Sequence, residues 1–136
     1  MTAGYSGKPL AQKLGIKSGM RLIILNAPAD YATTLGPLPD GVKQADDLAG
    51  TFDCIHYFTQ ERAAFEAEFP GLRDATRMNG MLWVSWPKKA AKMETDLDEN
   101  IIREIGLGFG MVDVKVCAVD ERWSGLKFVY RLKDRT

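Results

Sequence analysis

Three apolar runs constrain the fold of this chain more than any other feature. They span Met20–Leu25, Phe52–Phe58 and Met81–Trp86. The first does not alternate between apolar and polar residues apart from Arg21, and the other two are rich in aromatic and branched side chains. Runs of this kind are typical of strands that are covered on both faces, as in a parallel sheet. Because helical segments separate them, we expect right-handed crossovers and an α/β fold of three layers, with the three runs as parallel neighbours.

The last third of the chain predicts an antiparallel hairpin at one edge of this sheet. Val112–Val119 and Leu126–Leu132 both alternate between apolar and polar residues, and Trp123-Ser124-Gly125 lies between them as the expected turn. Along the first of these strands, four residues are expected on one face: Val112, Val114, Val116 and Ala118.

Capping residues predict the helices. A short helix over residues 8–14 has Ser6 or Gly7 as its cap, and Gly15 ends it in a left-handed conformation. Tyr31–Leu35 is expected to form one or two helical turns, and Val42–Ala45 is a weak strand candidate.

Two longer helices follow. The first is expected to start at Thr59 and reach Glu68; Pro70-Gly71 interrupts it before it resumes over Leu72–Thr76, and Asn79-Gly80 forms a turn. Thr95 is the expected cap of the second, with Asp98 at its third position, and Gly106, Gly108 and Gly110 weaken and end it.

Composition limits the class of protein. The 136 residues are the usual size of one domain, so we expect a single domain over residues 1–136. The 18 basic and 18 acidic residues give a net charge of zero, which argues against a nucleic-acid binder and against a polybasic membrane anchor. No apolar run approaches the length of a membrane helix and no signal peptide is evident, so the expected location is the cytoplasm.

The second half of the chain resembles class I S-adenosylmethionine-dependent methyltransferases. The likeness rests on Gly50–Ile55, on the stretch from Phe65 to Trp86, and on the closing helix and hairpin. It covers roughly residues 50–132 and implies a Rossmann-like sandwich.

Over nearly all its length the chain more closely resembles a small bacterial family of Rossmann-like domains of unknown function. That resemblance implies a fold and no activity. Its most specific stretches are Tyr5-Ser6-Gly7, Leu14–Lys17, Leu25–Pro28, Trp86–Lys89 and Asp120–Lys127.

The methyltransferase pattern fails in the loop that follows the first strand. Such enzymes carry glycines there, which let the backbone turn sharply and approach the cofactor. In this chain the loop over residues 26–30 reads Asn-Ala-Pro-Ala-Asp, and the chain is one strand–helix unit short. Asp46 or Asp47 could meet the ribose of the cofactor, but a nearby acid is a weak signal. We therefore expect no S-adenosylmethionine binding and no other cofactor.

Ligands of open α/β sheets bind beyond the carboxyl ends of the strands, which places a candidate site at Asn26, Pro28, Trp86 and Lys88. Asn26 offers an amide, Trp86 an apolar wall, and Lys88 a charge for a carboxylate or phosphate. The competing interpretation makes Asn26 a turn residue, Trp86 part of the core, and Lys88 a solvated surface side chain.

Familiar catalytic arrangements are missing from the sequence. His56 is the only histidine, and its place within a strand favours a hydrogen-bonded structural role. Cys54 and Cys117 lie in apolar runs and are expected to be buried hydrophobic residues. One histidine and two separated cysteines provide no metal-ligand spacing, and Ser85 lacks the glycines of a nucleophile elbow.

These observations favour a non-enzymatic module that binds a small molecule or a partner protein. The alternative is a divergent S-adenosylmethionine-dependent methyltransferase. A third interpretation is a homo-oligomer that pairs through the edge of its hairpin.

Overall fold

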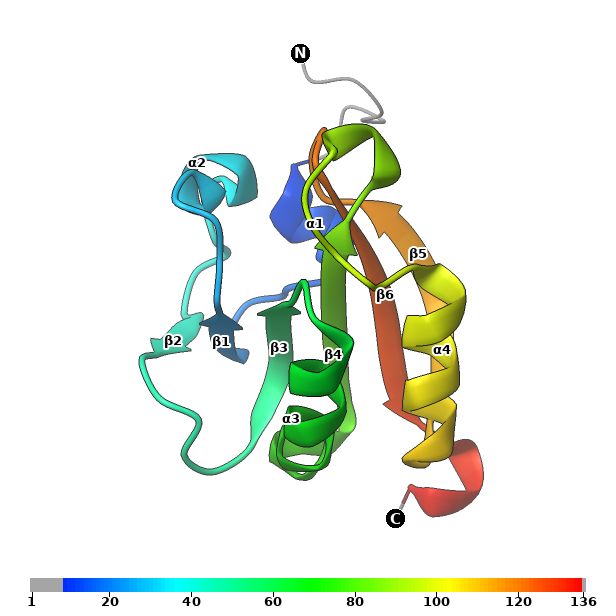
Figure 1. The fold of residues 1–136 in the computed structure, drawn as a ribbon. Helices are drawn as coiled ribbons and strands as arrows, with labels where there is room; N and C mark the ends of the chain where they lie inside the picture. The colour runs from blue at the N-terminus through cyan, green and yellow to red at the C-terminus, as the bar shows by residue number, and fades with distance from the viewer. Residues whose placement is uncertain (1–8, 136) are drawn as a thin grey trace.

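A computed structural model describes residues 9–135, and its six strands form one sheet in the order β2-β1-β3-β4-β6-β5 (Figure 1). The strands are β1 (Arg21–Leu25), β2 (Lys43–Ala45), β3 (Phe52–Phe58), β4 (Thr76–Pro87), β5 (Met111–Ala118) and β6 (Trp123–Tyr130). The helices are α1 (Leu10–Leu14), α2 (Tyr31–Leu35), α3 (Arg62–Ala75) and α4 (Glu99–Gly108), with short 3-10 helices at Lys89–Ala91 and Leu132–Asp134.

The pairing of the strands confirms the predicted parallel core. β1 pairs in parallel with β2 and β3, and β3 pairs in parallel with β4. β6 is antiparallel to β4 and β5, so the C-terminal hairpin inserts its second strand into the sheet and leaves β5 at the edge.

Helices cover both faces of the sheet, which confirms the three-layer sandwich. α3 and α4 lie in front of the sheet in Figure 1 and enclose one apolar core, whereas α1 and α2 pack on the opposite face around a second core. Neighbouring residues of β3 supply the two cores in turn: Ile55 and Tyr57 belong to the first, and Cys54 and Phe58 to the second.

The end of α1 follows its sequence signal. Gly15 is left-handed, with φ 82°, its N–H donates to Gln12 O, and the N–H of Ile16 donates to Ala11 O. The expected caps Ser6 and Gly7 lie outside the described residues.

α3 corrects one expectation, because it runs without interruption from Arg62 to Ala75 and contains Pro70. Phe65, Phe69 and Leu72 are buried on one face of the helix, so packing on both sides of Pro70 holds it together despite the lost hydrogen bond. Its N-cap position is Glu61 rather than Thr59.

The expected turn at Asn79-Gly80 is a bulge within β4. The register between β3 and β4 moves from Phe52↔Thr76 to Cys54↔Met81, so the extra residues bow out without ending the strand. Gly80 is needed there, since a Cβ atom would lie 2.9 Å from Asp53 O.

α4 begins later than expected, because Asp98 rather than Thr95 caps it. Asp98 Oδ1 accepts a hydrogen bond from the N–H of Ile101 at 2.9 Å. Thr95 instead joins two loops: its hydroxyl donates to Gln60 O at 2.7 Å and accepts from the N–H of Leu97.

The hairpin turn also lies earlier than predicted. β6 already begins at Trp123, and Asp120 Oδ1 accepts hydrogen bonds from the N–H groups of Arg122 and Trp123 to form the turn. The predicted common face on β5 is wrong as well, because the register shifts between Asp113 and Lys115 and leaves Val114 as the bulged residue, 55% exposed.

Two further sequence expectations concern the cysteines and the hydropathy of the helices. Cys54 and Cys117 are both buried and unpaired, as predicted. Among residues 9–135, no helix is sufficiently long and apolar to span a membrane.

Two glycines of α4 provide a matched test of this packing. A Cβ atom on Gly106 would lie 2.1 Å from the ring of Phe128, which is fully buried, whereas a Cβ atom on Gly108 would meet nothing within 4 Å. We expect Gly106→Ala to lower the free energy of unfolding by about 3 kcal/mol through overpacking. Gly108→Ala should leave it unchanged or raise it by up to about 1 kcal/mol. Urea denaturation of both variants checks this, and equal effects would contradict the packing described.

Candidate functional site

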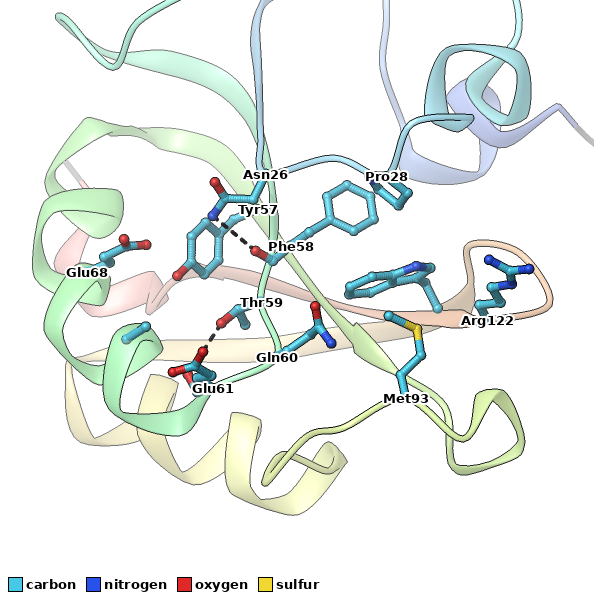
Figure 2. A pocket seen from close by; sticks show the side chains of 12 residues that line it. Asn26, Pro28, Tyr57, Phe58, Thr59, Gln60, Glu61, Glu68, Met93 and Arg122 are labelled. Carbon is cyan, nitrogen blue, oxygen red and sulfur yellow. Dashed lines mark hydrogen bonds between the residues drawn. The ribbon is translucent and has the colours of Figure 1, made fainter.

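A cavity of about 450 Å³ opens at the carboxyl ends of β1 and β3 (Figure 2). The chain passes from β1 to β2 on one side of β1, while β3 lies on its other side, so the crossovers diverge at this point. Such a switch point is where open α/β sheets bind ligands. The lining residues are Asn26, Pro28, Tyr57, Phe58, Thr59, Gln60, Glu61, Ala64, Glu68, Met93, Arg122 and Trp123.

The two ends of the cavity differ in charge. Glu68 of α3 and Glu61 lie at one end together with the ring of Tyr57, whereas Met93 and Arg122 lie at the other end (Figure 2). The cavity can therefore attract a cationic group near α3 and an anionic group near the hairpin turn.

Asn26 gives the loop after β1 its shape. Its backbone is left-handed, with φ 60°, which is a conformation that asparagine tolerates better than most residues other than glycine. Its side-chain Nδ2 donates to Phe58 O at 3.2 Å and so ties the end of β1 to the end of β3. Asn26 is thus left-handed in the loop where methyltransferases carry glycines.

Tyr57 and Thr59 form the floor of the cavity near β3. Burial first, and then a hydrogen bond with the carboxylate of Glu68, raise the pKa of Tyr57, so the phenol is held protonated against that carboxylate. The N–H of Thr59 donates to Ser85 O at 3.0 Å, and the Thr59 hydroxyl donates to Glu61 O at 3.4 Å. The first bond anchors the loop after β3 to β4, and the second lies within that loop.

The structure brings together only part of the site predicted from sequence. Asn26 and Pro28 line the cavity. Trp86 does not, because its side chain packs in the core beneath α3 and α4. Lys88 is also absent from the lining, although its N–H donates to Arg122 O at 2.8 Å and so holds the hairpin turn beside the cavity.

The predicted site did not include the other ten lining residues, among them Glu68, Met93, Arg122 and Trp123. Thr59, Gln60 and Glu61 follow directly after β3, so the rule that selected Asn26 also applies to them. The contribution of Glu68 depends on how α3 lies across the sheet, and that of Arg122 on the true position of the hairpin turn.

His56 lies below the cavity in a buried chain of hydrogen bonds. Its Nδ1 is 2.6 Å from the Tyr31 hydroxyl and its Nε2 is 2.7 Å from Ser85 Oγ. Burial lowers the pKa of His56 to about 3. The predicted structural role of His56 is confirmed, because the imidazole is fully buried and bonded at both nitrogens.

Replacing Asn26 should separate its conformational role from its side-chain bond. Asn26→Gly loses the bond to Phe58 O but keeps access to the left-handed region, whereas Asn26→Ala loses the bond and also strains the backbone. We expect Asn26→Ala to be less stable than Asn26→Gly by about 1 kcal/mol in urea denaturation. Equal stability of the two variants would refute the conformational role.

His56 should make stability depend on pH in a predictable direction. In the unfolded chain an imidazole takes up a proton below about pH 6.5, whereas the folded state, with a pKa of about 3, does not. Stability is therefore lost as pH falls from about 6.5 toward 3, with a slope of about 1.4 kcal/mol per pH unit from this group. Denaturation of the wild type and His56→Gln between pH 6 and 4.5 should show a shallower slope for the variant; parallel slopes would contradict this.

Comparisons with known proteins identify the fold. The sequence matches no protein-family model and no curated protein, so its resemblance to a small bacterial family stays a prediction. Among solved structures, TrmN from Thermus thermophilus is similar to it with a TM-score of 0.60 at 11% identity, over 90% of this chain but only 47% of that protein. The chain thus spans about half the length of TrmN.

Two further similar structures are named methyltransferases. Magnesium protoporphyrin IX methyltransferase (ChlM) from Synechocystis PCC 6803, with bound SAM, has a TM-score of 0.59 at 11% identity. The match covers 90% of this chain and 74% of that protein. The tRNA methyltransferase TrmK from B. subtilis has a TM-score of 0.55 at 13% identity and covers 96% of this chain and 69% of its own.

These neighbours contradict the expectation of a non-enzymatic binding module and favour the alternative, a divergent methyltransferase. That expectation depended on the absence of glycine from the loop after β1, and Asn26 makes the left-handed turn without one. The chain has a Rossmann-like fold that distantly resembles the class I S-adenosylmethionine-dependent methyltransferases.

Proposed function

We propose that this chain binds S-adenosylmethionine in the cavity between β1 and β3 and transfers its methyl group to an acceptor bound at the same edge. One observation carries the proposal: the cavity lies at the switch point of a methyltransferase-like sheet, beside a loop whose left-handed residue is Asn26. The proposal departs from our expectation that the loop without glycine excludes this cofactor.

The residues of the cavity suit such a cofactor. Its volume of about 450 Å³ falls within the range of small-molecule sites, about 300–1,000 Å³. The carboxylates of Glu61 and Glu68 favour a cationic ligand, and S-adenosylmethionine carries a sulfonium and an ammonium group. Phe58 and Trp123 are nearly buried and line the cavity, so only the edges of their rings would contact its planar base.

The bound cofactor supplies an electrophilic methyl group, and the residues of the chain hold and orient the reactants. Tyr57 is hydrogen-bonded to Glu68 and would hold that carboxylate in place at the cavity wall. Glu68 is exposed at the cavity wall and would accept the proton that an oxygen or nitrogen acceptor loses on methylation. Arg122, at the opposite end, would bind an anionic group of the acceptor.

Calorimetric titration with S-adenosylmethionine and S-adenosylhomocysteine tests the proposal. We expect binding of both with a dissociation constant in the micromolar range. Ala64 lines the cavity from α3 and its neighbour Ala63 does not, although both are exposed. Ala64→Trp should therefore weaken binding at least tenfold by filling the cavity, while the matched control Ala63→Trp should stay within twofold of the wild type.

Two results would overturn the proposal. One is the absence of a binding signal from the wild type at millimolar ligand. The other is equal affinity in the Ala64→Trp and Ala63→Trp variants, which would place any bound cofactor elsewhere.

The acceptor and the setting are further proposals. We infer that the acceptor is a small molecule or a protein rather than a nucleic acid, because the chain has no net charge. We also infer a cytoplasmic location. Homo-oligomerisation through the β5 edge is decided by sedimentation of the purified chain.

A further inference from the structure

Tyr31, His56 and Ser85 form a hydrogen-bonded chain that crosses from α2 to β3 and β4. The relevant distances are 2.6 Å from the Tyr31 hydroxyl to His56 Nδ1 and 2.7 Å from His56 Nε2 to Ser85 Oγ. Tyr31 is 4% exposed, and the other two side chains are fully buried. Neither His56 nor Ser85 lines the cavity between β1 and β3, so this chain has no direct contact with a ligand there.

The protons of this chain form one cooperative arrangement. His56 is neutral at physiological pH, so one ring nitrogen donates and the other accepts. Either Tyr31 donates to Nδ1 and Nε2 donates to Ser85, or both bonds run in the opposite direction. Removing either hydroxyl leaves a buried imidazole nitrogen without its partner, so the two outer residues depend on each other through His56.

Tyr31 connects this chain to the loop over residues 26–30. Tyr31 is the first residue of α2, and its N–H donates to Pro28 O at 3.0 Å. α2 has only five residues and no side-chain cap, so its intrinsic stability is low and its position depends on tertiary contacts. Pro28 lines both the cavity between β1 and β3 and a second cavity of about 400 Å³ whose wall includes Tyr31.

Ring contacts carry the same link to the wall of the site. Phe58 stacks on His56 with centroids 4.3 Å apart, and Tyr31 meets Phe58 edge-on at 5.1 Å. Trp123 meets Phe58 edge-on, also at 5.1 Å, and both Phe58 and Trp123 line the cavity. A shift of Tyr31 would thus move the loop over residues 26–30 on one side, and the aromatic wall formed by Phe58 and Trp123 on the other.

We propose that the chain Tyr31–His56–Ser85 positions the loop over residues 26–30 and the aromatic wall, and thereby shapes the ligand site. Its effect on cofactor affinity rests on the proposed function, whereas its effect on the loop does not. These are positioning residues: they act through Pro28 and Phe58.

The variants Tyr31→Phe and Ser85→Ala each remove one hydroxyl, and their double variant tests the coupling. Ile102→Val is the matched control, because Ile102 is fully buried in the core on the opposite face of the sheet. Thermal unfolding first confirms that all variants are folded at the working temperature. Hydrogen exchange by mass spectrometry then reports on the peptide covering residues 26–35, and calorimetry reports on S-adenosylhomocysteine affinity.

We expect each hydroxyl variant to speed exchange in residues 26–35 at least fivefold, and the double variant to show less than the product of the two effects. Each hydroxyl variant should also weaken the binding of S-adenosylhomocysteine at least fivefold. Ile102→Val should lower the melting temperature without changing the exchange rate of residues 26–35 or the affinity for S-adenosylhomocysteine. If the two hydroxyls were purely structural, Tyr31→Phe and Ser85→Ala would behave in the same way as Ile102→Val.

The failures are distinguishable. Unchanged exchange in residues 26–35 in Tyr31→Phe and Ser85→Ala overturns the positioning role. If the wild type binds S-adenosylhomocysteine, and the variants show faster exchange but the same affinity, the link between the three residues and the ligand site is overturned. Absence of wild-type binding overturns the proposed function, while the exchange data still decide whether Tyr31, His56 and Ser85 hold the loop over residues 26–30.

Discussion

The burial of β3 on both faces is the constraint on which the rest of the structure depends. Ile55 and Tyr57 fill the core beneath α3 and α4, while Cys54 and Phe58 fill the core beneath α1 and α2. A strand covered in this way must pair on both edges, since water cannot reach its backbone groups. β1 and β4 supply those pairs in parallel, and the direction of all three strands gathers their carboxyl ends at one edge.

The position of the cavity follows from this common edge and from the order of the strands in the sheet. β2 lies outside β1, and β3 lies on the inner side, so the chain leaves a gap between the loops that follow β1 and β3. Asn26 closes the base of this gap by bonding Phe58 O, and α3 supplies the carboxylate of Glu68 at its wall. The cavity is therefore a property of the topology, with its charge set by side chains from distant segments.

The structure also shows the weak step in the argument from the missing glycines. Glycines in the loop after β1 permit a sharp turn and a close approach of the backbone to the cofactor, and the turn itself needs only a left-handed residue. Asn26 meets this need with φ 60°, because a short polar side chain tolerates that region and can bond locally. The similarity to methyltransferase structures at 11–13% identity is consistent with a fold that keeps its geometry while its residues change.

The sequence by itself determined the elements whose signals are local. Apolar runs identified the three parallel strands, Gly15 identified the end of α1, and the position of His56 within a strand indicated its structural role. Asn26 and Pro28 were predictable as residues of this sheet edge, where they line the cavity, because they follow directly after a buried strand.

Tertiary structure decided what depends on packing between distant segments. Burial of Phe65, Phe69 and Leu72 kept α3 continuous through Pro70, although a proline normally ends a helix. The bulge at Val114 reversed the faces of β5, because one extra residue shifts an alternating pattern by one. Trp86 turned into the core, and Glu68 and Arg122 reached the cavity, since only the assembled layers determine which side chains meet at the open edge of the sheet.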